Sequence, residues 1–169
     1  MNLRVEGRAR RLGDDVNTDY LIASRRKRET LDPGVLKRYL LEAVDPGFAA
    51  SLQPGDMIVA GRNFGCGSAM EIAVTVLQAA GIKAVVAQSF ARSFYRNAIN
   101  NGLLPIQCGT SGVREGDRLR VEGREGSLSI ANLTTGTRMT GEPLTGIVLE
   151  ILDAGGLVPY ILRRRLAWG

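Results

Sequence analysis

A glycine-rich segment between two apolar stretches is the part of this sequence best suited to chemistry. It runs from Asn63 to Glu71, with Gly65 and Gly67 on either side of Cys66. Glycine lets the backbone approach a ligand closely, and a loop ahead of a helix offers free N–H groups and the helix dipole to an anion. The segment is not a dinucleotide-binding fingerprint, because the glycine spacing is wrong and no acidic ribose partner follows about twenty residues later.

Two interpretations of Ser68 stay open on spacing alone. With Glu71 three residues later, Ser68 forms the pattern of a capping box, in which the two side chains satisfy backbone N–H groups at the start of a helix. A serine at that position also lies at the positive end of the helix, where its alkoxide form would be stabilised and could act as a general base. The two roles are compatible, so both are kept.

The composition excludes several kinds of active site. The chain has two cysteines, Cys66 and Cys108, and no histidine. Two thiols cannot hold a four-cysteine iron–sulfur cluster, and a cysteine–histidine zinc site is impossible. Catalysis by serine–histidine or cysteine–histidine pairs is excluded within this chain as well. We therefore expect no metal site here, and a general base must be a hydroxyl, a carboxylate, a lysine or a tyrosine, or come from another chain.

Positive charge gathers in two clusters within a net charge of +5. One is Arg25-Arg26-Lys27-Arg28 and the other is Arg163-Arg164-Arg165. Solvated surface explains such clusters, and so does attraction to small acids or to nucleic acid. A nucleic-acid binder usually interleaves aromatic residues with its basic ones, and the first cluster contains none. The pattern favours small anions or plain surface over nucleic acid.

The elements around the glycine-rich segment predict a parallel sheet. An apolar strand at Asp56 to Ala60 comes before it, and a helix is expected from Ser68 to Ala80. A second strand follows at Ala84 to Ala87, then a helix that Ser89 caps, then a third strand at Leu103 to Ile106. This alternation of strands and helices implies parallel strands joined by right-handed crossovers.

The flanking regions add further strands and helices to an α/β fold with a parallel sheet layer and antiparallel strands. We expect a strand at Leu3 to Ala9, a polar loop at Gly13 to Asp19, a basic loop, a helix at Val35 to Ala43, antiparallel strands at Arg118 to Glu122 and Ser127 to Asn132, and helices at Leu144 to Leu152 and Leu157 to Leu166. With 169 residues, of which 44% are hydrophobic, the chain predicts a single domain over residues 1–169.

The sequence also predicts where the protein resides. No apolar stretch follows the charged N-terminus, so we expect no secretory signal peptide. No window approaches eighteen consecutive apolar residues, so we expect no membrane span. A cytoplasmic location is the resulting expectation.

Several segments, in the right order, resemble the small subunits of 3-isopropylmalate dehydratase and homoaconitase, which belong to the aconitase superfamily. The segment from Asn63 to Glu71 is similar to the signature Asn-Phe-Gly-Cys-Gly-Ser-Ser-Arg-Glu of that family. The resemblance continues in the polar loop at Gly13 to Asp19, in Gly81 to Ala87, in Ser89 to Asn100 and in Ala154 to Val158. It implies a swivelling domain of the β/β/α type, as in the aconitase C-terminal domain.

The same resemblance implies a role for individual residues. Ser68 corresponds to the serine base that takes a proton from carbon, and Asp19 corresponds to an acidic residue near the site; we expect both to be catalytic. Thr18, Gly67 and Ala69 are expected among the substrate-binding residues.

It also implies a partner and a reaction. A large subunit would carry a [4Fe–4S] cluster, so this chain would hold no cofactor itself and would be active only in a heterodimer or heterotetramer. The reaction would be dehydration and rehydration of a 2-hydroxy polycarboxylate, of the kind found in leucine biosynthesis, by a lyase (hydro-lyase). The small polycarboxylate would then be the ligand, with no nucleic acid and no membrane involved.

One departure from the family pattern affects substrate recognition. Ala69 and Met70 stand where the family has serine and arginine. Arginine would hold a substrate carboxylate with two hydrogen bonds, which methionine cannot do. Losing such a charge-assisted contact costs about 1.5–3 kcal/mol of binding. Either the substrate is recognised differently here, or activity is weak.

A second departure from the family pattern could compensate for the missing arginine. Aligned without gaps, the loop that discriminates substrates in the family contains Arg26, Lys27 and Arg28 in this chain. We hypothesise that this loop provides the carboxylate contact that Met70 lacks, and that Arg26, Lys27 and Arg28 bind substrate. Plain surface is the alternative for this loop.

Three functions remain in competition. The first is the hydro-lyase subunit, of the 3-isopropylmalate dehydratase type or of a homoaconitase-like or other malate-type dehydratase with an altered substrate. The second is a non-catalytic, anion-binding partner subunit, which Ala69 and Met70 favour. The third is a nucleic-acid-binding domain, for which salt-sensitive binding to duplexes would be the sign.

Overall fold

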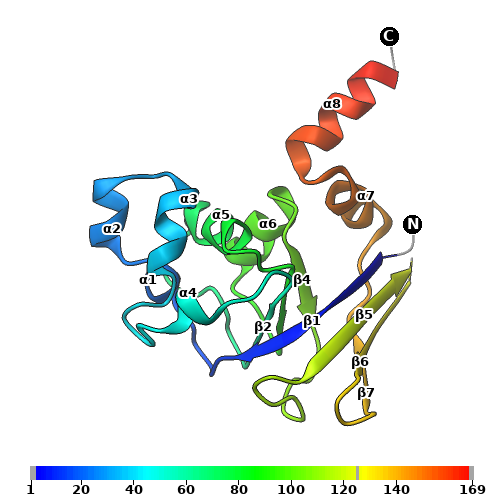
Figure 1. The fold of residues 1–169 in the computed structure, drawn as a ribbon. Coiled ribbons are helices and arrows are strands. Elements are labelled where there is room, and N and C mark those ends of the chain that lie inside the picture. Colours follow the sequence, from blue (N-terminus) through cyan, green and yellow to red (C-terminus); the bar gives the residue numbers. More distant parts are fainter. Residues whose placement is uncertain (1–2, 125, 168–169) are drawn as a thin grey trace.

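The structure is a computed structural model and describes residues 3–124 and 126–167. Within these residues, seven strands form one mixed sheet in the order β4-β3-β2-β1-β5-β6-β7. β1 (Leu3–Arg11) lies in the middle of the sheet and joins a parallel half to an antiparallel half (Figure 1). The predicted combination of a parallel layer with antiparallel strands is confirmed.

The parallel half positions the glycine-rich segment. It contains β2 (Met57–Ala60), β3 (Ala84–Ala87) and β4 (Leu104–Gln107), each predicted to within one residue. All residues of β2 and β3 are buried, as is usual for parallel strands covered on both faces. Successive side chains of a strand point to opposite faces, so Met57 packs in one hydrophobic cluster and Ile58 in the other.

The antiparallel half is formed by β5 (Arg118–Arg124), β6 (Ser127–Asn132) and β7 (Arg138–Gly141). β5 pairs with β1, and β6 lies between β5 and β7. In β5, buried Leu119 and Val121 alternate with exposed or half-buried residues, which is the pattern that predicted this strand. β7 was not predicted, because four residues with one buried position give no periodicity.

Helices cover the two faces of the sheet differently. One face carries α1 (Thr18–Leu21), α3 (Pro33–Leu36), α4 (Phe48–Ser51), α5 (Ile72–Ala79) and α6 (Arg92–Asn100), with the 3₁₀ turn η1 (Lys37–Tyr39) among them. Leu149 of α7 (Gly146–Ala154) packs in the cluster on the other face. α2 (Ser24–Glu29) lies outside both hydrophobic clusters.

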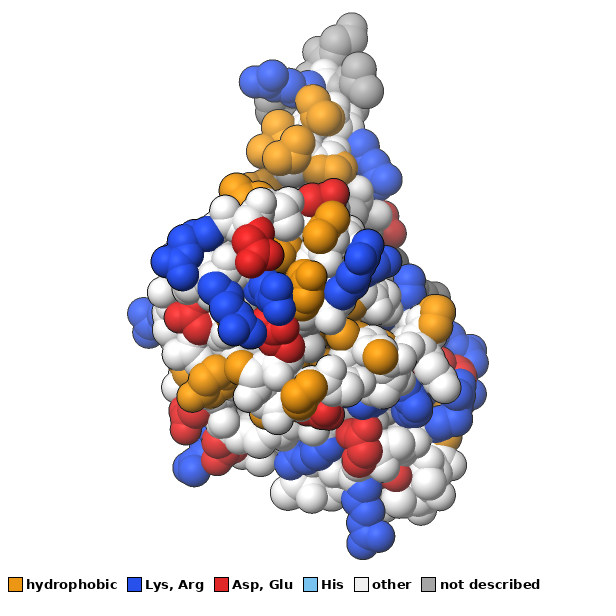
Figure 2. Space-filling model, turned by 60° about the vertical axis from the view of Figure 1, so that its left-hand side comes forward, with side chains coloured by type: hydrophobic (Ala, Val, Ile, Leu, Met, Phe, Trp, Pro, Cys, Tyr) orange, Lys and Arg blue, Asp and Glu red, His pale blue; other side chains and the backbone are white. Residues whose placement is uncertain are grey.

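The last helix, α8 (Leu157–Ala167), leads away from the sheet (Figure 1). Hydrophobic side chains are exposed along this projection in the space-filling view (Figure 2), and they include Val158, Ile161 and Leu162. α7 and α8 agree with the helices predicted for the C-terminal part to within two residues. No helix among the described residues is long and apolar enough to span a membrane.

Three predicted elements were wrong because tertiary contacts decide the local structure. The helix expected at Val35 to Ala43 ends at Leu36, and the chain then turns through Leu41, whose φ is 58°, so that Leu40 and Leu41 are both buried. The basic loop is the helix α2. Ser89 caps no helix: its Oγ accepts a hydrogen bond from the Asn63 N–H at 2.8 Å, and α6 begins three residues later.

Candidate functional site

Two segments that follow β1 and β2 lie side by side at the carboxyl edge of the parallel strands, which is where α/β sheets commonly bind ligands. They are the polar loop at residues 13–19 and the glycine-rich segment at residues 61–68. Backbone hydrogen bonds join them from end to end: Gly61 N–H to Gly13 O at 3.1 Å, Asp15 N–H to Arg62 O at 2.8 Å, Gly65 N–H to Val16 O at 2.8 Å, and Thr18 N–H to Cys66 O at 2.9 Å. The structure thus brings two predicted site segments together.

Glycine is required at two positions of this segment. Gly65 and Gly67 have φ of 80° and 88°, which residues with a side chain rarely adopt. A Cβ on Gly67 would come within 2.5 Å of the Asn17 side chain, and one on Gly65 would overlap the ring of Phe94. The glycines therefore let the segment pack tightly between the polar loop and α6.

Ser68 is exposed, but it does not cap a helix. α5 begins at Ile72, and its N-cap is Glu71, whose side chain makes no capping hydrogen bond. The backbone oxygen of Ser68 accepts a hydrogen bond from the Thr18 hydroxyl at 2.9 Å, instead of from the first turn of a helix. The predicted capping box is wrong, and with it the expectation that Ser68 stands at the first turn of a helix.

Thr18 is buried, with 1% of its surface exposed. Its N–H donates to Cys66 O and its hydroxyl donates to Ser68 O, both at 2.9 Å. The hydroxyl is therefore directed at the backbone of the glycine-rich segment. Gly67 and Ala69, which flank Ser68, are exposed. Substrate binding by Thr18, Gly67 and Ala69 stays a prediction.

Asp19, Lys27 and Met70 meet although they come from three different segments, and Met70 follows Ser68 by two residues in the chain. The Lys27 ammonium lies 3.1 Å from Asp19 Oδ1 and 2.9 Å from Met70 Sδ, and 12% of the Lys27 side chain is exposed. The Ser24 hydroxyl donates to Asp19 Oδ1 at 3.0 Å. Hydrogen bonds from Lys27 and then Ser24 lower the pKa of Asp19. A cation from α2 thus lies against the position where an arginine was expected.

The three cations predicted to bind substrate are in different environments. Arg26 donates to both carboxylate oxygens of Glu42, at 2.9 and 3.0 Å, and its guanidinium lies 3.7 Å from the centre of the Tyr39 ring. The hydrogen bond with Glu42 raises the pKa of Arg26. Arg28 is exposed and makes no ion pair within the described residues. Of the three, Lys27 lies closest to the predicted catalytic segment.

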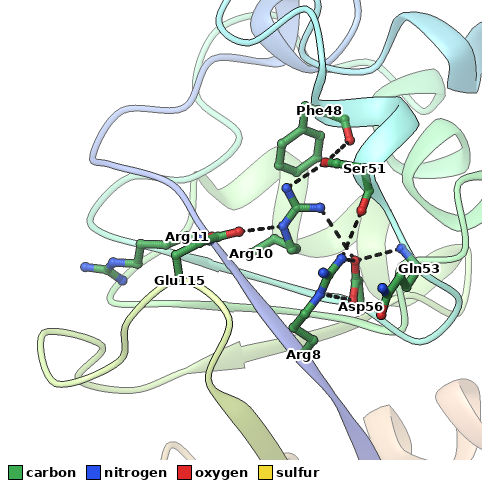
Figure 3. Close-up of polar contacts among 8 residues, drawn as sticks. All are labelled: Arg8, Arg10, Arg11, Phe48, Ser51, Gln53, Asp56 and Glu115. Atoms are coloured by element: carbon green, nitrogen blue, oxygen red, sulfur yellow. Dashed lines mark hydrogen bonds and ion pairs between the residues drawn. The ribbon is translucent and has the colours of Figure 1, made fainter.

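A buried ionic network, which the sequence did not reveal, ties β1 to the start of β2 (Figure 3). Asp56 accepts hydrogen bonds from Arg8 Nε at 3.1 Å, from Arg8 Nη2 at 2.7 Å and from the Gln53 N–H at 2.9 Å. Arg10 Nη1 lies 3.6 Å from Asp56, while Arg10 Nε donates to Glu115 at 2.7 Å. Burial raises the pKa of Asp56, but the hydrogen bonds from Arg8 and Gln53 outweigh it, so the pKa is lowered.

The cysteines offer little as a ligand set. Cys66 is partly exposed in the glycine-rich segment, whereas Cys108 is buried, which raises the pKa of its thiol to about 11. Within the part of the chain that the structure describes, no three histidine, cysteine, aspartate or glutamate side chains gather as a metal site would require.

Comparison with known proteins shows which family and which proteins this chain is similar to. Residues 39–111 match the family described as the aconitase C-terminal domain. The 3-isopropylmalate dehydratase small subunit of Moorella thermoacetica is 43% identical over 95% of this chain and 96% of its own length. The methanogen homoaconitase small subunit of Methanocaldococcus jannaschii is 44% identical over 96% of this chain and 94% of its own.

A solved structure agrees with the fold. The crystal structure of 3-isopropylmalate dehydratase from Methanocaldococcus jannaschii superposes with a TM-score of 0.91, at 42% sequence identity, and the match covers 98% of each chain. The fold class predicted from the sequence, the swivelling domain of the aconitase C-terminal type, is confirmed by this match and by the family match at residues 39–111.

Proposed function

Because this chain belongs to the family of 3-isopropylmalate dehydratase small subunits, we propose that it is the small subunit of a hydro-lyase acting on a 2-hydroxy polycarboxylate. The observation that carries the proposal is the match over nearly the whole chain, with Ser68 held at the carboxyl edge of the sheet. The active enzyme would be a complex with a large subunit, at a stoichiometry of one or two copies of each chain.

The cofactor would belong to that partner. Cys66 is partly exposed and Cys108 is buried, so the thiols of this chain do not form the four-ligand set of an iron–sulfur cluster. A [4Fe–4S] cluster on the large subunit would polarise the substrate hydroxyl. The part left to this chain is to hold a proton acceptor and to orient carboxylates.

Ser68 is the proposed proton acceptor. Its hydroxyl is exposed and makes no hydrogen bond within the described residues, so it is free to approach a substrate carbon. Its backbone is fixed by the Thr18 hydroxyl, and Gly67 gives the chain the left-handed turn just before it. A fixed base at the correct distance contributes through orientation as well as through proton transfer.

Lys27 is the proposed carboxylate contact in place of the arginine that Met70 replaces. Its ammonium lies 2.9 Å from Met70 Sδ, two residues after Ser68 in the chain. The ionised Asp19 holds the ammonium there, at 3.1 Å, and would orient it toward the substrate. Because lysine is a compact point charge, the contact would be less directional than a paired arginine contact. Arg28, exposed one residue later, stays a further candidate.

A substrate with an additional carboxylate is the second candidate, and Lys27 favours it. The relatives include an isopropylmalate/citramalate isomerase small subunit at 44% identity and the homoaconitase small subunit, so similar chains belong to enzymes named for different acids. A cation beside Ser68 would suit an acid more charged than an isopropyl-substituted one.

Reconstitution tests the proposal. The chain is co-expressed with its cognate large subunit without oxygen, and the complex is offered 3-isopropylmalate, citramalate and homocitrate. We expect turnover of at least one acid, and loss of nearly all turnover in Ser68→Ala, with Ser127→Ala, at the exposed start of β6, as the matched exposed-serine control. A stable complex that turns over none of the acids would favour a non-catalytic, anion-binding subunit instead.

A further inference from the structure

A hollow opens at the same edge of the sheet as the glycine-rich segment that contains Ser68. It has a volume of about 400 Å³ and is lined by Phe90, Arg92, Tyr95, Arg96, Gln107 and Glu142. Phe90 follows β3 and Gln107 ends β4, so both lie at the carboxyl edge of the parallel strands. The Ala91 N–H donates to Phe64 O at 2.9 Å, which joins this hollow directly to the glycine-rich segment.

The hollow has a rigid base. The rings of Phe64 and Phe94 pack edge to face with centroids 5.0 Å apart, and Phe90 stacks parallel to Phe94 at 6.2 Å. Tyr95 packs against Phe90 at 5.7 Å. Phe64 and Phe94 are buried, so the rim residues of α6 are attached to a fixed part of the core.

The rim carries positive charge without a partner. Arg92 and Arg96 lie four residues apart on α6, so they share a face, and both are exposed. Neither makes an ion pair within the residues that the structure describes. The acid of the rim, Glu142, accepts a hydrogen bond from Gln107 at 2.8 Å. Two guanidinium groups are thus available to an outside acceptor.

Arg92 is also poorly placed for the stability of its own helix. It is the first residue of α6, where the positive end of the helix dipole disfavours a cation, and the first turn of α6 contains no acid to compensate. Tyr95 adds a hydrogen-bond donor, since burial, and then the Glu142 charge, raises the pKa of its phenol. The rim therefore combines donors and aromatic rings, the composition typical of the energetic centres of protein interfaces.

We infer that this hollow receives a carboxylate-bearing segment of the large subunit. The inference rests on the proposed function, since a partner that closes over Ser68 must cover the edge of the sheet to which both sites belong. Charge complementarity selects the chemistry of the segment: an aspartate or glutamate side chain fits between Arg92 and Arg96, and an apolar neighbour fits against Phe90 and Tyr95.

A double charge reversal tests the inference. Arg92→Glu/Arg96→Glu is compared with Arg114→Glu/Arg118→Glu, two exposed arginines that are also four residues apart and make no ion pair among the described residues. Affinity for the purified large subunit is measured by calorimetry without substrate. We expect the first pair to weaken binding about tenfold or more, with a smaller salt dependence, and the control pair to change it less than about twofold.

Unchanged affinity in the Arg92/Arg96 variant, or an equal loss in both variants, would overturn the docking site. Thermal unfolding of each variant shows whether it is folded, and Arg92→Gln/Arg96→Gln replaces the reversal if that variant does not fold. Turnover is measured separately at saturating large subunit. Binding that depends on these arginines without any turnover would sink the hydro-lyase proposal alone, whereas turnover with unchanged affinity would sink the docking site alone.

Discussion

Arg8 and Arg10 pair with the buried Asp56 (Figure 3), whereas Arg25 and Lys27 lie on the short helix α2, from which Lys27 reaches Met70 in the glycine-rich segment. The first pair comes from β1, where the arginines are spread among other residues and form no recognisable cluster in the sequence. The second pair belongs to a run of four cations. The number of charged residues in a stretch of sequence therefore does not show whether they serve folding or binding. Their burial and their distance to a partner show it.

The Asp56 network and the ion pairs of α2 differ in the cost of removing one charged side chain. Asp56 has 2% of its side chain exposed and Arg10 has 9%, so removing one member leaves a buried charge without its partner. The ion pair of Lys27 is more open to water, because 48% of the side chain of its partner Asp19 is exposed, and such pairs contribute little to stability. We therefore expect the buried network to govern folding and the α2 cations to govern binding.

Asp56→Asn tests the first half of this comparison and has the largest expected effect. The variant should lower the free energy of unfolding by about 3–5 kcal/mol, since Arg8 and Arg10 lose their shared carboxylate. Chemical denaturation of the isolated chain measures it. The control is Asp153→Asn, whose carboxylate is exposed and lies 4.0 Å from Arg163, and which should change stability by less than about 0.5 kcal/mol. Equal losses in the two variants would contradict a special role for the buried network.

The pH dependence of stability tests whether the ionised Asp56 carboxylate is the group that stabilises the fold. The folded pKa of Asp56 lies below its ordinary value of 3.8, so the unfolded carboxyl binds a proton first as the pH falls. Its contribution is complete well above that value and is lost as the pH falls through the folded pKa. The gap in unfolding free energy between wild type and Asp56→Asn should therefore narrow between about pH 6 and pH 3. A gap that stays constant over this range would exclude Asp56 as its source.

Lys27→Met tests the second half of the comparison. Removing the ammonium between Asp19 and Met70 should raise the KM of the reconstituted enzyme about tenfold or more, because a charge-assisted contact is lost. The free energy of unfolding should change little, since the proposed role of the Lys27 ammonium is to bind the substrate carboxylate. Arg25→Met is the matched control on the same helix, because Arg25 is exposed and pairs with Glu42. If the two variants have equal KM values, Lys27 does not contact substrate.

Patterns of apolar residues within short segments were enough to predict most of the strands. The apolar runs of β2, β3 and β4 predict buried parallel strands, and alternation predicts β5 and β6. The short edge strand β7 has too few buried positions to give a pattern. The order of motifs indicated the family and the swivelling fold, both of which the comparisons confirm.

Contacts between distant residues account for what could not be predicted. The capping box predicted at Ser68 is absent because α5 begins only at Ile72, and the Ser68 backbone oxygen accepts instead from Thr18, fifty residues earlier. The ion pair of Arg8 with Asp56 spans 48 residues. Nothing in the spacing of Arg26, Lys27 and Arg28 shows that Arg26 pairs with Glu42 while Lys27 reaches Met70.

Thr18→Val gives the smallest expected effect and tests whether a buried contact can serve the reaction as well as the fold. Valine keeps the shape of threonine but removes the donor to the Ser68 backbone oxygen, so the Ser68 hydroxyl should lose its fixed position. We expect kcat of the reconstituted enzyme to fall about tenfold, which corresponds to about 1.4 kcal/mol, with KM nearly unchanged.

Thr18→Ser is the matched control, because it keeps the hydroxyl and loses one methyl group. It should retain most of kcat, whereas a purely structural role for Thr18 would lower the stability of both variants and leave kcat per folded complex unchanged. A kcat about tenfold lower in Thr18→Val, with normal thermal unfolding, would make Thr18 a positioning residue for Ser68. The strict division between buried contacts for folding and α2 cations for binding would then fail at the point where the polar loop meets the glycine-rich segment.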